Sequence, residues 1–121
     1  MGSMSHRVDP ADLATEATPR GNRPYLLYAG RNGSARVNHV HTEIETAPTG
    51  TTAICTGFGR GIISHVEDDG PLSLLWPAAS AEDFSLIADG TGSIVDETLR
   101  ISITDAVLHR PAPADGGPAT C

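Results

Sequence analysis

The chain has 121 residues, of which 39% are apolar and 19% are charged. This length favours a single domain, and it is enough to bury one hydrophobic core without disulfides or metals. The formal net charge of −7 argues against a nucleic-acid partner, because binding to phosphates needs a basic surface.

Cysteine usage and the N-terminal residues bear on the compartment. The two cysteines, Cys55 and Cys121, are too few for a disulfide scaffold, and Cys55 lies in an apolar stretch typical of a reduced core residue. The N-terminal residues lack the apolar segment of a signal peptide, and no apolar run is long enough for a membrane span. We therefore expect a cytoplasmic protein without a membrane partner.

Composition divides the chain into three parts. Residues 1–22 are polar and are predicted to be partly helical, because Asp9 is a good N-cap residue and Pro10 suits the first helical position. Residues 23–110 are predicted to form the folded domain. Residues 111–121 are rich in proline, glycine and alanine, which predicts a flexible tail.

Strand patterns dominate the folded domain. A compact apolar run at 23–30 precedes Asn32-Gly33, a dipeptide that strongly favours a hairpin turn. Five further strands are predicted at 35–46, 51–56, 70–77, 82–90 and 98–109. In the last of them Leu99, Ile101 and Ile103 alternate with polar residues, so they are predicted to share the buried face.

One short helix is predicted between the third and fourth strands. It covers residues 61–69, with Ile62, Ile63 and Val66 expected on one face. The predicted fold class is therefore mainly β, with about six strands and one or two short helices. Strands at this spacing, joined mostly by tight turns, suggest an antiparallel barrel.

The turn 56–61, with the sequence TGFGRG, is the first candidate site. A strand that ends in glycines and leads into a helix can present free backbone N–H groups to an anion. Arg60 adds a guanidinium group suited to phosphate. The spacing matches no standard nucleotide-binding pattern, so a plain connection with a solvent-facing arginine remains the alternative.

The stretch NHVHTEIE is the second candidate site. On a single strand His39, His41, Glu43 and Glu45 would lie on one side. Two imidazoles and a carboxylate can form an open metal site, and the spacing of His39, His41 and Glu45 is similar to the first cupin motif. The second cupin motif is missing downstream. A polar strand face and a wall of a flavin pocket are the alternatives.

Trp76, the single tryptophan, is the third candidate. Tryptophan is enriched both in cores and at dimer interfaces, and its ring can also stack on a flat cofactor. No spacing of serine, histidine and acidic residues indicates a catalytic triad, because triads are recognised by geometry.

Five segments together resemble the pyridoxamine 5′-phosphate oxidase-like family of flavin-binding split barrels. In chain order they are RPYLLYAGRNGSARV, TGFGRG, GPLSLLWP, FSLIADGTGSI and ISITDAVLHRPAP. The resemblance covers residues 23–113 and is closest to short actinobacterial members. It implies a six-stranded split β-barrel that forms a homodimer.

The resemblance also implies a cofactor site. FMN, or a deazaflavin in some branches, would lie at the dimer interface with its phosphate at the turn. Thr56, Gly57, Arg60 and Gly61 are the phosphate residues that this resemblance implies. Asn38 and His39 would lie beside the cofactor, and Trp76 would pack at the interface.

The expected function is that of a flavin-dependent oxidoreductase acting on a small molecule that the sequence does not identify. The family often has a second cation just after its first arginine, followed by an asparagine, but this chain has Ile62 or Ile63, and His65, at those places. A non-enzymatic flavin- or ligand-binding module is therefore the first alternative. A cupin-like metal protein using His39, His41 and Glu45 is the second.

Overall fold

The computed structural model describes residues 4–110, which form eight strands, two short α-helices and two 3₁₀ turns. The strands are β1 (Met4–Arg7), β2 (Tyr25–Ala29), β3 (Ala35–His39), β4 (His41–Ala47), β5 (Gly50–Thr56), β6 (Leu72–Trp76), β7 (Ser85–Val95) and β8 (Thr98–Arg110). The helices are α1 (Leu13–Ala17) and α2 (Ile62–Glu67), and the 3₁₀ turns are η1 (Pro10–Asp12) and η2 (Thr18–Arg20). The flexible tail predicted for 111–121 lies outside the described residues.

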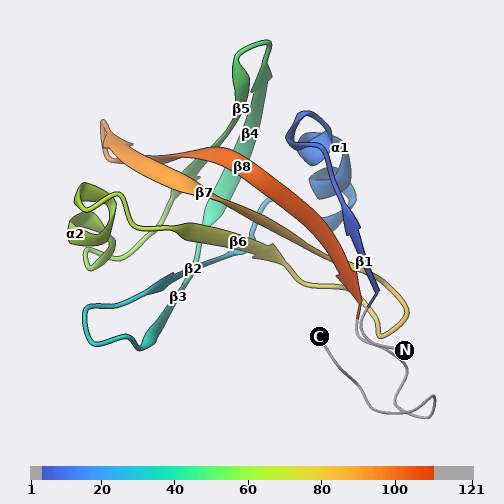
Figure 1. The fold of residues 1–121 in the computed structure, drawn as a ribbon, viewed down its shortest axis with the longest axis horizontal. Coiled ribbons are helices and arrows are strands. Elements are labelled where there is room, and N and C mark those ends of the chain that lie inside the picture. The colour runs from blue at the N-terminus through green and yellow to red at the C-terminus, as the bar shows by residue number, and fades with distance from the viewer. Residues whose placement is uncertain (1–3, 111–121) are drawn as a thin grey trace.

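All eight strands belong to one antiparallel sheet with the order β3-β2-β6-β7-β8-β5-β4, and β1 pairs with β8. The long β7–β8 hairpin crosses the molecule, and the β2–β3 and β4–β5 hairpins extend from it on opposite sides (Figure 1). The expectation of a mainly β, antiparallel protein with one or two short helices is confirmed. The strand number is eight, not six.

The first hairpin forms where Asn32-Gly33 predicts it. The β2 and β3 strands pair from Tyr25 with His39 to Ala29 with Ala35. Gly33 has a φ of 81°, a left-handed conformation that glycine adopts without strain. The Gly33 N–H donates to the carbonyl of Gly30, which closes the loop.

The single strand predicted at 35–46 is wrong, because the chain forms two strands that separate at Val40. The Val40 side chain is fully buried, and the backbone N–H of Val40 donates to the Pro24 carbonyl over 3.1 Å. The N–H of Thr42 likewise donates to the Asn22 carbonyl. Val40, buried and bonded to Pro24, therefore marks the point where the chain passes from its pairing with β2 to its pairing with β5.

The N-terminal segment contains the predicted helical start. The Asp9 carboxylate accepts the Ala11 N–H over 2.9 Å, and Pro10 occupies the first position of η1. A strand that the sequence did not predict, β1, precedes it and pairs with β8. Leu13 of α1 is fully buried in the core, so this segment contributes to the hydrophobic interior.

The helix α2 forms within the predicted range, but the assignment of Ile63 to its buried face is wrong. Ile62 and Val66, four residues apart, are buried, whereas Ile63 is 40% exposed. Successive residues of an α-helix are rotated by about 100°, so Ile63 points away from the face that its neighbour buries.

The last strand confirms its predicted alternation. Leu99, Ile101 and Ile103 of β8 are buried, and the polar residues between them are exposed. Together with side chains from β2, β5, β6 and β7 they form one hydrophobic core. No helix within residues 4–110 has the length and apolar character needed to cross a membrane.

Cys55 is a free, buried thiol in this core, as expected. Burial raises the pKa of the Cys55 thiol from 9.0 to about 11, and a hydrogen bond with Thr42 partly offsets the effect. Below pH 9 the thiol is protonated in both the folded and unfolded chain. Above pH 9 the unfolded chain releases the proton and the folded chain retains it, so the free energy of unfolding falls as pH rises toward 11.

We therefore expect the wild type to lose about 2 kcal/mol of stability from this group between pH 8 and pH 10.5. Cys55→Ala should lack that part of the loss, because alanine does not titrate. Urea unfolding of both proteins at the two pH values measures the difference. An equal loss of stability in wild type and variant would contradict the prediction.

Candidate functional site

The turn between β5 and α2 is held in place from both ends. Thr56 is the last residue of β5 and is paired with His41. Gly57 follows with a φ of 87°, which lets the chain leave the sheet. Phe58 is half-buried against the core. The turn is therefore anchored, while its glycines remain exposed.

The Asn38 side chain joins the turn to β3. Its side-chain oxygen accepts the N–H of Gly59 over 2.8 Å. A Cβ built on Gly57 would lie 4.0 Å from the carbonyl oxygen of His39, so the end of β3 and the turn are close. The structure thus brings the pair Thr56 and Gly57 close to the pair Asn38 and His39, although the two pairs lie 17 or more residues apart along the chain.

Arg60 and Gly61 form the exposed end of the turn. Among the described residues, the Arg60 guanidinium makes no hydrogen bond or ion pair. The first two N–H groups of α2, from Ile62 and Ile63, donate back to the carbonyls of Gly59 and Arg60. The guanidinium is therefore the clearest anion-binding group of the turn, ahead of the helix amides.

His39 presents a flat, exposed ring on the face of the β2–β3 hairpin opposite Asn38. Its ring stacks on Tyr25 with centroids 4.6 Å apart and an interplanar angle of 19°. Its Nε2 donates to the Arg23 carbonyl over 3.0 Å, because a carbonyl can only accept. The ring is therefore held in one orientation by a hydrogen bond and by a stacked neighbour.

The histidines of the expected metal face have separate partners. His39 ends β3, whereas His41 begins β4 and lies with its Nε2 3.0 Å from the Asn22 side chain. Within residues 4–110, no group of three or more histidine, cysteine, aspartate or glutamate side chains is placed to hold a metal ion. The structure therefore adds no support to a metal centre of His39, His41 and Glu45.

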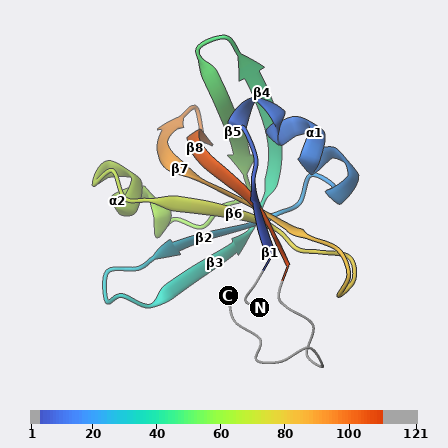
Figure 2. The ribbon, with the colours of Figure 1, turned by 45° about the vertical axis from the view of Figure 1, so that its right-hand side comes forward.

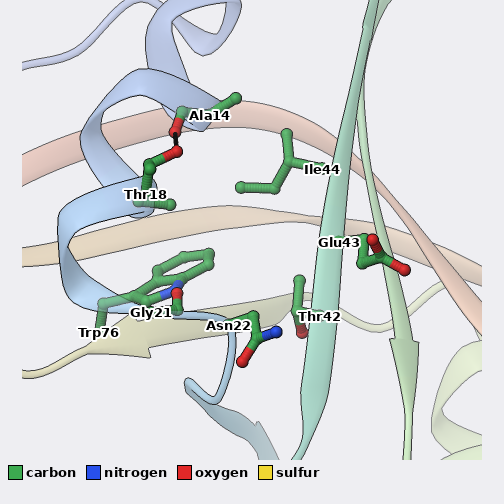
Figure 3. Close-up of a pocket in the computed structure, with 9 residues that line it drawn as sticks. Ala14, Thr18, Gly21, Asn22, Thr42, Glu43, Ile44 and Trp76 are labelled. Carbon is green, nitrogen blue, oxygen red and sulfur yellow. Dashed lines mark hydrogen bonds between the residues drawn. The ribbon is translucent and has the colours of Figure 1, made fainter.

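Trp76 lies away from the turn. Its side chain is 2% exposed, and its indole N–H donates to the Gly21 carbonyl over 3.0 Å. It forms the floor of a cavity of about 460 Å³ between the α1–η2 segment and β4 (Figure 3). The residues of the turn do not line this cavity. The structure therefore does not bring Trp76 together with the other predicted site residues.

Side chains from both walls line the Trp76 cavity. Thr18 and Ala14 approach it from the helical side, and Ile44 and Thr42 from β4, while Glu43 points away from it (Figure 3). The Thr18 hydroxyl donates to the Ala14 carbonyl, and Thr42 is hydrogen-bonded with Cys55. The hydroxyls on these walls are thus engaged with the protein itself, while Asn22 adds a polar side chain to the lining.

Sequence reasoning missed Tyr28, which lies near the turn, and Tyr25, which lies against His39 on the opposite face of the hairpin. Tyr25 stacks on His39, and the Tyr28 hydroxyl would lie 3.0 Å from a Cβ built on Gly61. Both belong to β2, which the sequence identified only as an apolar run. Knowledge of which residues face each other across the β2–β3 hairpin would have placed them beside Asn38 and His39.

Comparisons with protein-family models, with curated proteins and with solved structures give no match.

Proposed function

We propose that the protein binds FMN, or a deazaflavin, with its phosphate at the turn 56–61, and that it uses the bound flavin as an oxidoreductase on a small molecule. The proposal includes a split β-barrel and a homodimer with the flavin at the interface. It rests on the sequence resemblance together with the geometry around the turn.

The bond from Gly59 to Asn38 is the observation that carries this proposal. It fixes a glycine-rich turn against a neighbouring strand and leaves the Arg60 guanidinium exposed and unpaired within the described part of the chain. An arginine held on a rigid, exposed turn suits a phosphate, which it can bind through two parallel hydrogen bonds.

The chain's own groups would then have distinct roles. Arg60 would bind the phosphate, and Thr56 would offer its hydroxyl at the strand end. The stacked pair of His39 and Tyr25 would give a flat surface for an aromatic ring and exclude water from one side of it. A flavin supplies hydride or electron-pair transfer, so no catalytic triad is needed.

An apolar row on the outer face of the sheet supports the homodimer. Tyr25 is paired with Leu75, Leu75 with Ile87, and Ile87 with Val107. These four side chains lie on the face opposite the core, and Tyr25 is 37% exposed. A second copy covering this row would bury apolar surface next to the stacked ring of His39.

Replacement of Arg60 tests the phosphate site. We expect Arg60→Ala to raise the dissociation constant for FMN about tenfold or more, because the variant loses a charge-assisted hydrogen bond. Arg7→Ala is the matched control. It removes the same charge from an exposed ion pair with Asp105, on a strand that does not contact the turn.

Quenching of FMN fluorescence measures both constants, with the wild type titrated in parallel. If Arg60→Ala and Arg7→Ala bind FMN as tightly as the wild type does, the phosphate is not at the turn. A deazaflavin is titrated in the same way, to determine which of the two flavins the wild type prefers.

A non-enzymatic binding module is the second candidate, and the position of Ile62 favours it. Ile62 is fully buried in the core, and Ile63, the other residue at the place where the family often has a second cation, is 40% exposed but carries no charge. Under this alternative the chain binds flavin, but the bound flavin is reduced and reoxidised no faster than free flavin. Stopped-flow reduction of the complex separates the two candidates.

A further inference from the structure

The inner face of the β2–β3 hairpin is directed toward the turn 56–61 and α2. Tyr28 is paired with Arg36, and Leu26 with Asn38, so these four residues share one face of the two strands. Asn38 binds Gly59 on this face. Arg36 lies two residues before Asn38 on the same side of β3, and therefore closer to the hairpin loop.

A small cavity of about 160 Å³ opens between the hairpin loop and α2. It is lined by Tyr28, Ala29, Gly30, Arg31, Gly61, Ser64, His65 and Asp68. In both ribbon views α2 and the tip of the β2–β3 hairpin lie at the same end of the sheet (Figures 1 and 2). This volume is below the range of about 300–1,000 Å³ for whole-ligand pockets, so it suits one end of a ligand.

One arginine lines this cavity, and two more lie next to residues that line it. Arg31 lines it, and Arg60 directly precedes Gly61 on its opposite wall. A Cβ built on Gly30, another lining residue, would lie 3.0 Å from Arg36 Nε, so this side chain extends along the same wall. Within residues 4–110, none of the three guanidinium groups has a hydrogen bond or an ion pair.

Unpaired cations at one place are notable in a chain of net charge −7. Arg7 and Arg20 have acidic partners, whereas the guanidinium groups of Arg23 and Arg100, like the three near the cavity, have none within residues 4–110. The cavity also offers the hydroxyls of Tyr28 and Ser64 as hydrogen-bond donors, whereas Asp68 is an acidic side chain on its wall.

We propose that Arg31, Arg36 and Arg60 together bind the anionic end of a phosphorylated ligand that carries two or more negative charges. The β2–β3 hairpin thus supplies the additional cations that are absent after Arg60 in the sequence, Arg31 from its loop and Arg36 from β3. This inference rests on the proposed function, because it extends the phosphate site at the turn to the neighbouring hairpin. Tyr28 and Ser64 complete the set of donors, and Asp68 weakens the binding of anions.

Titration of the full chain with inorganic pyrophosphate tests the three-arginine site. Isothermal titration calorimetry should show saturable binding, and Arg31→Gln and Arg36→Gln should each raise the dissociation constant about tenfold. Arg100→Gln is the matched control. It removes the same charge from an exposed side chain on β8, outside the cavity. It should leave the constant within about twofold of the wild type, because exposed distant charges are screened by salt.

Asp68→Asn is expected to change the dissociation constant for pyrophosphate in the opposite direction. Removal of this carboxylate should lower the dissociation constant for pyrophosphate about threefold, an effect in the range of exposed charge pairs. A structural disturbance would weaken binding, so tighter binding identifies an electrostatic role. Far-ultraviolet circular dichroism confirms that each variant is folded.

The outcomes separate this inference from the proposed function. Pyrophosphate binding that depends on Arg31 and Arg36 supports the site even if FMN does not bind, in which case the flavin proposal alone fails. FMN binding that depends on Arg60 but not on Arg31 or Arg36 overturns the inference and leaves the flavin proposal standing. Absence of pyrophosphate binding at millimolar concentration also overturns the inference.

Discussion

Gly90→Ala is expected to lower the free energy of unfolding by about 3 kcal/mol or more, at the upper end of overpacking effects. Gly90 lies in β7, and a Cβ built there would be 2.0 Å from the carbonyl oxygen of Ser102 in β8. The clash is with backbone, so no side chain can move aside to relieve it. It also falls at the β7–β8 register shift, in the hairpin that the other strands pack around.

Thr91→Ala is the control for this prediction, since Thr91 is the next residue of β7 and is exposed. It should lower stability by less than about 1 kcal/mol, the span of strand propensities. Urea unfolding followed by circular dichroism measures both changes. A Gly90→Ala protein as stable as Thr91→Ala would show that β7 and β8 do not approach as closely as described.

Trp76→Ala is expected to cost about 3–5 kcal/mol, as for other large aromatic side chains removed from a core. The indole is 2% exposed, and its N–H bond to Gly21 ties β6 to the chain between η2 and β2. The variant would leave a void below the 460 Å³ cavity and a carbonyl without its donor.

Trp76→Phe separates the contribution of core packing from that of the hydrogen bond, because phenylalanine keeps an aromatic ring and loses the N–H group. We expect it to cost about 0.5–1.5 kcal/mol, the net contribution of one hydrogen bond, because Gly21 is exposed and water can bind its carbonyl. Circular dichroism is the appropriate probe, since Trp76 is the only tryptophan. If Trp76→Ala costs less than 1 kcal/mol, the side chain is not the core element described above.

Strands with a strong apolar pattern were predictable from the sequence. The alternation in β8 correctly assigned Leu99, Ile101 and Ile103 to the core, because one side of that strand packs on the interior along its length. By contrast, Ser5, His6 and Arg7 of β1 are all exposed, so that strand has no apolar pattern. It forms through backbone pairing with β8, which local sequence does not reveal.

The register of the first hairpin was not predictable from its turn dipeptide. A two-residue turn at Asn32-Gly33 would pair Ala29 with Arg36, but the structure pairs Ala29 with Ala35. The loop includes a hydrogen bond from the Gly30 N–H to the Ser34 carbonyl. A shift of one residue exchanges the two faces of a strand, so the face that carries Arg36 and Asn38 depends on this loop.

The candidate site was predicted in part, and through resemblance more than through pattern. The contact between Asn38 and Gly59 joins segments that composition and periodicity cannot connect. The role expected of Trp76 beside the cofactor remains a prediction, and the structure places this residue below a different cavity. Arg31 and Arg36 had no motif to identify them, because their proximity to the turn follows from the hairpin register.

Titration of wild-type protein with FMN, followed by flavin fluorescence, tests the central claim most directly. The account predicts saturable binding at micromolar protein, with one flavin per chain and weaker binding after replacement of Arg60. Absence of saturable binding of FMN and of a deazaflavin, at concentrations well above micromolar, would contradict the proposed flavin-dependent function.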